Sequence, residues 1–214
     1  MTCVTEIQVE LTTNEANRLR KWGSLWLDLL HVYMTLHQRL NTPDIPSNAF
    51  TRRALWESSV VSYGRMESSD RKRKLEHHAL LTAAGCDCAF HEQIMQWRHG
   101  HVAHRLSNEF EETATVAVYV DGNSELESLN LHVSTWVGPP DASTLVTAFL
   151  EHVTKLRDAL WKTYLAPIGE TLAKRQQAIT ELGPQFEGLT TTERLMVNCT
   201  LWARSNGTGI PRLS

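Results

Sequence analysis

The sequence lacks the features that define several classes of protein. No stretch approaches the roughly 20 consecutive apolar residues that a transmembrane helix needs, so we expect no membrane span. With 11 glycines and 7 prolines among 214 residues, the chain is too poor in both for a collagen or a linker. Its 42% of hydrophobic residues is too rich for a disordered tail and predicts a folded domain of ordinary size.

Cysteine and positive charge are also scarce. Four cysteines are too few for a disulfide framework at this length. The first ten residues contain Glu6 and Glu10 and no basic-then-apolar run, so we expect no secretory signal and a cytoplasmic location. The balance of 21 Lys and Arg against 24 Asp and Glu gives a net charge of −3, so contact with nucleic acid would need a local basic patch.

The apolar pattern predicts a mainly α-helical protein. Apolar residues recur at steps of three and four, which is typical of helices that bury one face. Thr12, Thr13 and Asn14 are candidate N-caps for the first such stretch, and Gly85 follows a shorter one as a stop signal. The predicted helices are 14–40, one starting near Ser47, 71–84, 87–110, and 142–164 with an extension toward 179.

A change of period interrupts the helices after residue 110. Residues 113–120 alternate with β-branched side chains, and 129–135 alternate again after the turn-forming pair Asp121-Gly122. The sequence therefore predicts a bundle of four or five helices over 1–183, with a β-hairpin at about 113–136 inserted after the third long helix. Residues 184–214 are expected to form a C-terminal extension with a short helix over 190–203 and a loose tail.

Histidines are concentrated in one part of the chain. Six of the 10 fall between His77 and His104, and the densest stretch is Trp97–Arg105. On a continuous α-helix one stripe would carry core-like residues first and imidazoles last, with Arg98 beside them. Gly100 removes a side chain in the middle, which lets another molecule approach. The residues of this predicted stripe are Phe90, Ile94, Trp97, His101 and His104.

Arginine and histidine together supply the chemistry for cleaving RNA without a metal. The guanidinium of Arg98 offers a planar fork of donors that matches phosphate oxygens. An imidazole titrates near neutral pH and can take or give a proton. The 2′-hydroxyl of the RNA would be the nucleophile, while the arginine neutralises charge that builds on the phosphate.

The stretch Arg98-His99-Gly100-His101-Val102-Ala103-His104 resembles the motif of the HEPN superfamily, which is Arg, four to six residues and His on the third long helix of a small bundle. The ending Ala103-His104 is most similar to the AbiU2-like branch. The upstream stretch 54–65 also resembles the second helix of such proteins. In element order the resemblance covers 19–164.

The resemblance implies an activity and an assembly. Many HEPN proteins are metal-independent ribonucleases in toxin–antitoxin or phage-defence systems, and others only bind RNA or a protein partner. Two subunits meet through their motif helices and build one composite site. If the roles of the family's motif residues apply to this chain, Arg98 would hold the phosphate and His104 would transfer the proton. His99 and His101 would assist or shape the groove. An antitoxin protein is a further expected partner, and no cofactor is expected.

Three more residues are candidates for contact with RNA. Glu57 and Arg65 lie two helical turns apart on one side of a predicted helix, either beside the motif or as a solvent-facing pair. Arg105 directly follows His104. The run 71–74 is either a solvated face or a patch for the RNA backbone.

The sequence does not favour a metal site. The spacing of Cys86, Cys88 and His91 is unusual for zinc, and His77 and His78 could complete a ligand set only if the chain folded back sharply. The two cysteines are expected to be small buried residues that open a helix. A non-catalytic HEPN-like binding module and a metal site within 86–104 remain the alternatives to the ribonuclease.

Overall fold

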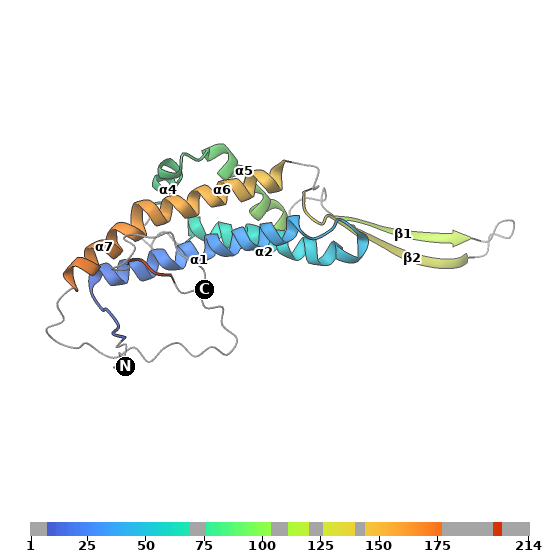
Figure 1. The fold of residues 1–214 in the computed structure, drawn as a ribbon. Coiled ribbons are helices and arrows are strands. Elements are labelled where there is room, and N and C mark those ends of the chain that lie inside the picture. Colours follow the sequence, from blue (N-terminus) through green and yellow to red (C-terminus); the bar gives the residue numbers. More distant parts are fainter. Residues whose placement is uncertain are drawn as a thin grey trace.

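The computed structural model describes residues 8–68, 76–103, 111–119, 126–139, 144–176 and 199–202. Within these ranges the chain is mostly helical, with one two-stranded antiparallel sheet (Figure 1). The predicted mainly α-helical fold with an inserted hairpin is therefore confirmed. None of the described helices combines the length and the apolar character that crossing a membrane requires.

Helices α1 and α2 form an antiparallel pair along the length of the bundle (Figure 1). Helix α1 (Asn14–Leu40) is capped by Thr13, whose hydroxyl accepts a hydrogen bond of 3.2 Å from the backbone N–H three residues later, as predicted. Helix α2 (Ala49–Ser68) follows a 3-10 turn, η1 (Pro46–Asn48). The expected cap Ser47 lies inside that turn, because proline at the first position starts the turn earlier.

A helical hairpin follows α2: its first helix lies against α6 (Leu145–Ala159), and its second contacts α2 (Figure 1). Helix α4 (His77–Ala84) ends at Gly85, which adopts a left-handed conformation with φ of 61°. Helix α5 (Cys88–Trp97) then begins with Asp87 as its N-cap. The chain thus makes the sharp fold-back that the sequence alone did not favour.

The predicted helix over 87–110 changes character after Trp97. Residues Arg98–Ala103 form a π-helical turn, η2, and 104–110 lie outside the described residues. In a π-helix each residue bonds to the fifth one along, so the residues that follow rotate off the α-helical stripe. The predicted α-helix over 87–110 is therefore interrupted at Arg98, while the side chain of His101 and all of His104 lie outside the described residues, so the predicted stripe beyond Trp97 stays a prediction.

The last helical segment is continuous from 145 to 175, as predicted. It consists of α6 (Leu145–Ala159), a π-helical turn η4 (Leu160–Leu165) and α7 (Ala166–Arg175). Pro167, which has no N–H to donate, is the second residue after the wide turn. Residues 199–202 are not helical, and the rest of the predicted helix over 190–203 lies outside the described residues.

The core lies between α1, α2 and α6, and aromatic rings fill its centre. Phe149 of α6 meets the rings of Trp56 and Tyr63 of α2 edge-on, with centroids 5.9 and 5.1 Å apart. Trp26 of α1 packs on Trp161 of η4 at 5.6 Å. The burial of each large apolar side chain contributes about 1.5–3 kcal/mol to the free energy of unfolding, so these ring contacts hold the three helices together.

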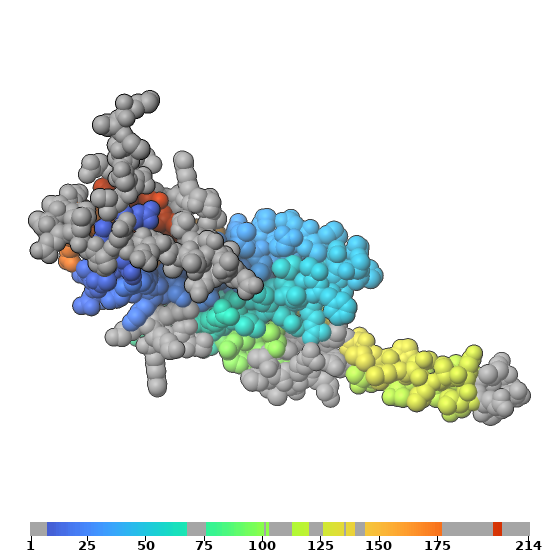
Figure 2. Space-filling view, turned by 90° about the horizontal axis from the view of Figure 1, so that it is seen from below, coloured from blue at the N-terminus to red at the C-terminus, as the bar shows by residue number. Residues whose placement is uncertain are grey.

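The hairpin extends away from the end of the bundle as an arm (Figures 1 and 2). Strand β1 (Glu111–Tyr119) pairs with β2 (Leu126–Thr135), which confirms the predicted strands. Tyr119 pairs with Leu126, so six residues, 120–125, connect the strands, and the predicted Asp121-Gly122 turn lies outside the described residues. The side chains along β2 that face one way are apolar and 58–71% exposed: Leu129, Leu131 and Val133.

A buried arginine attaches the root of the arm to the bundle. Arg39, at the end of α1, is 1% exposed and donates hydrogen bonds of 3.0 Å to the carbonyls of Val137 and Pro139. Between them Gly138 has φ of 108° and lies against the Trp56 ring, where a Cβ would approach to 2.9 Å. The chain leaving β2 is therefore fixed at two points.

One buried tyrosine links three helices through hydrogen bonds. The hydroxyl of Tyr63 on α2 lies 2.7 Å from Nδ1 of His91 on α5 and 2.8 Å from Nε2 of His152 on α6. All three side chains are almost fully buried. Burial, reinforced by nearby His91, lowers the pKa of His152 from 6.5 to about 4, so this imidazole is neutral in the folded protein at neutral pH.

The stability of the fold should therefore fall in mild acid. Between the unfolded pKa of 6.5 and the folded pKa of about 4, the unfolded chain binds a proton at His152 that the folded chain excludes. The free energy of unfolding should drop over this range by about 3 kcal/mol from this group. Urea unfolding followed by circular dichroism across the range measures the drop.

A substitution separates this contribution from that of other groups. The variant His152→Gln should lose most of the pH dependence, whereas His37→Gln, at an exposed position on α1, should keep it. An unchanged slope in His152→Gln would contradict the assignment.

Candidate functional site

Arg98 lies where the motif segment meets α2. It is the C-cap residue of α5 and the first residue of the π-turn η2, and its side chain is half-buried. A Cβ built on Gly64 of α2 would overlap the Cδ and Nε atoms of Arg98. The absence of a side chain at Gly64 thus forms a notch in α2, and the arginine side chain lies in it.

The neighbouring contact fixes this arrangement. Trp97 packs edge-on against the buried Trp56 of α2, with centroids 5.4 Å apart and an interplanar angle of 86°. The π-turn begins at the next residue, directly after this anchored ring. Single π-turns of this kind are frequent at functional sites, because they widen the helix and redirect side chains.

The guanidinium is the charged end of the Arg98 side chain. Among the residues that the structure describes, it has no hydrogen-bond or ion-pair partner, although its stem is held against α2. A partly desolvated positive charge without a counter-ion is unfavourable, so an anion gains by binding there. Phosphate oxygens match the planar donors of arginine.

The other motif residues are only partly placed. His99 is exposed in the π-turn, next to Arg98. The backbone of His101 belongs to the same turn, while its side chain is outside the described residues, as are His104 and Arg105 entirely. The expected pairing of Arg98 with His104 in one groove therefore stays a prediction.

Glu57 and Arg65 form separate ion pairs. The carboxylate of Glu57 accepts a hydrogen bond of 2.7 Å from Nε of Arg53, one turn earlier on α2. Arg65 lies 3.2 Å from Asp28 of α1, across the helix pair. The two residues are thus not paired with each other: the Glu57 pair lies within α2, and the Arg65 pair joins α2 to α1. Their predicted contact with RNA remains untested.

The two cysteines lie where α5 begins, as predicted, although they are half-buried rather than buried. Cys88 is the first residue of the helix, and Cys86 follows the left-handed glycine. The sulfur of Cys86 lies 3.8 Å from the carbonyl oxygen of His152, and that of Cys88 lies 4.0 Å from Nδ1 of His78. Burial raises the pKa of the Cys86 thiol, which keeps it protonated.

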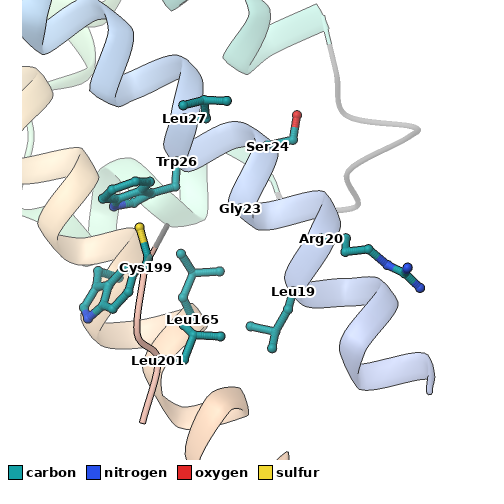
Figure 3. A pocket seen from close by; sticks show the side chains of 10 residues that line it. Leu19, Arg20, Gly23, Ser24, Trp26, Leu27, Leu165, Cys199 and Leu201 are labelled. Atoms are coloured by element: carbon teal, nitrogen blue, oxygen red, sulfur yellow. The ribbon is translucent and has the colours of Figure 1, made fainter. Parts of the chain in front are cut away.

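A pocket of about 390 Å³ lies elsewhere, between α1, the turn η4 and residues 199–201 (Figure 3). Its walls are mostly apolar, with Leu19 and Trp26 on one side and Leu165 on another, and Cys199 and Leu201 close it. None of the residues predicted for RNA cleavage lines it. Leu201 also contacts Gly169 of α7, where a Cβ would come within 2.8 Å, so part of the C-terminal extension packs on the bundle.

Comparison of the chain with protein-family models, with curated proteins and with solved structures finds no match. The resemblance to HEPN proteins therefore rests on the motif residues themselves, and it stays a prediction.

Sequence reasoning missed the part that α2 plays in the site. The signal was present as Gly64 inside an otherwise helical stretch, since a glycine there costs about 1 kcal/mol relative to alanine. Such a glycine often marks a close approach of another segment. Here that segment is Arg98.

Filling the notch should displace the arginine without harming the fold. In Gly64→Ala the new methyl group meets the flexible end of the Arg98 side chain, which can move away. We expect the binding of a short single-stranded RNA to weaken by about tenfold, because a charge-assisted hydrogen bond is worth about 1.5 kcal/mol or more. Thermal unfolding should be unchanged or shifted upward, since alanine favours the helix.

Gly23→Ala is the matched control, because Gly23 is also inside a helix and no atom lies within 4 Å of a Cβ built there. It should keep full RNA binding. Equal affinities in the two variants would show that the notch does not position Arg98 for a ligand.

Proposed function

We propose that this chain is a metal-independent endoribonuclease of the HEPN type. The observation that carries the proposal is Arg98, a half-buried arginine seated in a glycine notch with no anionic partner among the described residues. His104, six positions further along the motif segment, is the candidate for proton transfer. The π-turn between them supports a ligand-binding role for this segment.

The proposed reaction uses the RNA as its own nucleophile. The 2′-oxygen attacks the adjacent phosphorus and loses its proton, while the bond from phosphorus to the 5′-oxygen breaks and that oxygen gains a proton. The products are a 2′,3′-cyclic phosphate and a 5′-hydroxyl end. Arg98 stabilises the charge that develops on the non-bridging oxygens, and His104 transfers one of the two protons.

A composite site would supply the second proton-transfer group. In this proposal two chains associate through their motif segments, so that Arg98 and His104 of both lie along one groove. His99 is exposed beside Arg98 and is therefore accessible to the RNA or to the second chain. Acid and base roles divided in this way predict a bell-shaped dependence of rate on pH.

The central test is cleavage of single-stranded RNA in the presence of EDTA. Purified protein should produce fragments with cyclic phosphate ends. Arg98→Ala should lower the rate by at least about 100-fold, because it removes the main stabilisation of the transition-state charge. Arg98→Lys should recover only part of the rate, since lysine lacks the planar fork. His104→Ala should be similarly inactive.

The control is Arg175→Ala, which removes an exposed arginine of α7 that pairs with Glu15 at 2.7 Å, far along the chain from the motif. It should cleave at the rate of the unaltered protein, and circular dichroism should show that all variants keep their helix content. Cleavage that requires added metal, or that survives in Arg98→Ala, would reject the proposal.

The second candidate is a non-catalytic binding module, and the arm favours it. One face of the hairpin is an apolar surface made by Leu129, Leu131 and Val133, opposite the small residues of β1. An isolated two-stranded hairpin is only marginally stable in water. A second copy of the chain offers an identical apolar face at the same concentration, and two such faces pack at the usual distance between sheets. We therefore take a second copy as the occupant.

The double variant Leu129→Ser with Leu131→Ser tests this surface. It should weaken self-association in sedimentation equilibrium without lowering the melting temperature of the bundle, because both side chains lie on the arm. His132→Ser, on the opposite face of the same strand, is the control and should associate normally. Unaltered association of the double variant would exclude the arm as the contact.

A further inference from the structure

Three side chains that could bind a metal meet at one end of the buried tyrosine network. Glu67 of α2, His77 of α4 and His91 of α5 each offer a ligand atom, and these atoms all lie within 4.8 Å of one another. The three come from separate helices, and the fold-back at Gly85 brings the two histidines together. Glu67 is exposed, His77 is half-buried and His91 is buried, so the group is reachable from solvent.

The two imidazoles have a separation that suits a shared ion. The rings of His77 and His91 lie 5.4 Å apart between centroids, with an interplanar angle of 23°. Two imidazoles that bind one ion through nitrogens about 2.0–2.1 Å away, at a tetrahedral angle, have centroids roughly 5 Å apart. Ligand atoms around a tetrahedral ion lie roughly 3.3 Å apart, so the side chains would close in from separations of up to 4.8 Å, and Glu67 is exposed to solvent.

An outer hydrogen bond orients the buried ligand. Nδ1 of His91 is bonded to the Tyr63 hydroxyl at 2.7 Å, which leaves Nε2 as its ligand atom. A histidine that binds a metal usually has its other nitrogen fixed in this way, because the second bond sets both the tautomer and the ring orientation. His152 holds the tyrosine from the far side at 2.8 Å.

We propose that Glu67, His77 and His91 bind one divalent first-row transition metal ion. Two imidazoles and one carboxylate are a donor set for Zn²⁺, Fe²⁺ and their neighbours rather than for Ca²⁺ or Mg²⁺. Three protein ligands leave at least one position for water. The ion connects α2, α4 and α5, and it adds to the anchoring of the eight-residue α4, whose Leu80 and Leu81 are buried in the core.

The proposed ion is separate from the proposed reaction. His91 and Arg98 are seven residues apart, about two helical turns or 10 Å along the axis. The ion contacts α5 at His91, away from Arg98, and the cleavage chemistry does not use it. Arg98→Ala should accordingly leave metal binding unchanged, so the two proposals can fail independently.

The test is a titration of the full chain with Zn²⁺. Bound metal is first removed with a chelator, and the chelator is then removed. In competition with a chromophoric chelator we expect one ion per chain, and the melting temperature should rise with Zn²⁺ because only the folded state binds it. Co²⁺ should bind to the same group and give visible absorption bands typical of nitrogen and oxygen ligands. Glu67→Gln and His77→Gln should each weaken binding by more than tenfold and remove the rise in melting temperature.

Matched controls are available on the same surface. Glu92→Gln changes an exposed carboxylate directly beside His91, and His37→Gln changes an exposed imidazole of α1. Both should bind Zn²⁺ like the unaltered chain. Tyr63→Phe should weaken binding by about 10- to 100-fold, which is the usual effect of losing an outer-sphere partner. The proposal is overturned if the chain binds no Zn²⁺, or if Glu67→Gln and His77→Gln bind it as tightly as the controls.

Discussion

The hydroxyl of Tyr63 is the point on which the rest of this structure depends. It carries one proton and is bonded to an imidazole on each side, so it donates to one and accepts from the other. If His91 binds a metal through Nε2, its Nδ1 carries a proton and donates to Tyr63, which in turn donates to His152. Metal binding thus selects one of the two possible directions for this chain of hydrogen bonds. Burial keeps the phenol protonated, since it raises the pKa of Tyr63 far above its usual value.

Helix α2 uses two consecutive residues for opposite purposes. Tyr63 points into the core, where it joins α5 and α6, and Gly64 opens the notch that holds Arg98. Helix α5 and the motif residue at its end are therefore attached to α2 at two points, His91 and Arg98, which are two turns apart. A change that loosens the buried network would also alter the position of the arginine.

Local chemistry explains which features could be predicted from the sequence. The cap at Thr13 and the stop at Gly85 depend on interactions within a few residues, and the helix boundaries that they set agree with the structure. The π-turn was missed because apolar spacing is read with an α-helical period, and that period cannot reveal a change in hydrogen bonding at Arg98.

Contacts between distant residues were the other limit. Glu67 and His77 approach His91 only because three helices pack together, and no spacing rule anticipates that meeting. Only part of the Arg98 site could be predicted from the sequence. The motif identified the arginine, but its contact with Gly64 depends on how α2 and α5 pack. The buried position of Arg39 was likewise hidden, because an arginine that caps backbone carbonyls a hundred residues away has no local signature.

The same aromatic ring lies at the base of the arm and behind the motif. Trp56 contacts Gly138 where the arm ends, and it contacts Trp97 immediately before Arg98. Strands of this length make a lever about 30 Å long. A movement of the hairpin relative to the bundle would therefore act on the Trp56 ring, and through Trp97 on the backbone that leads into Arg98.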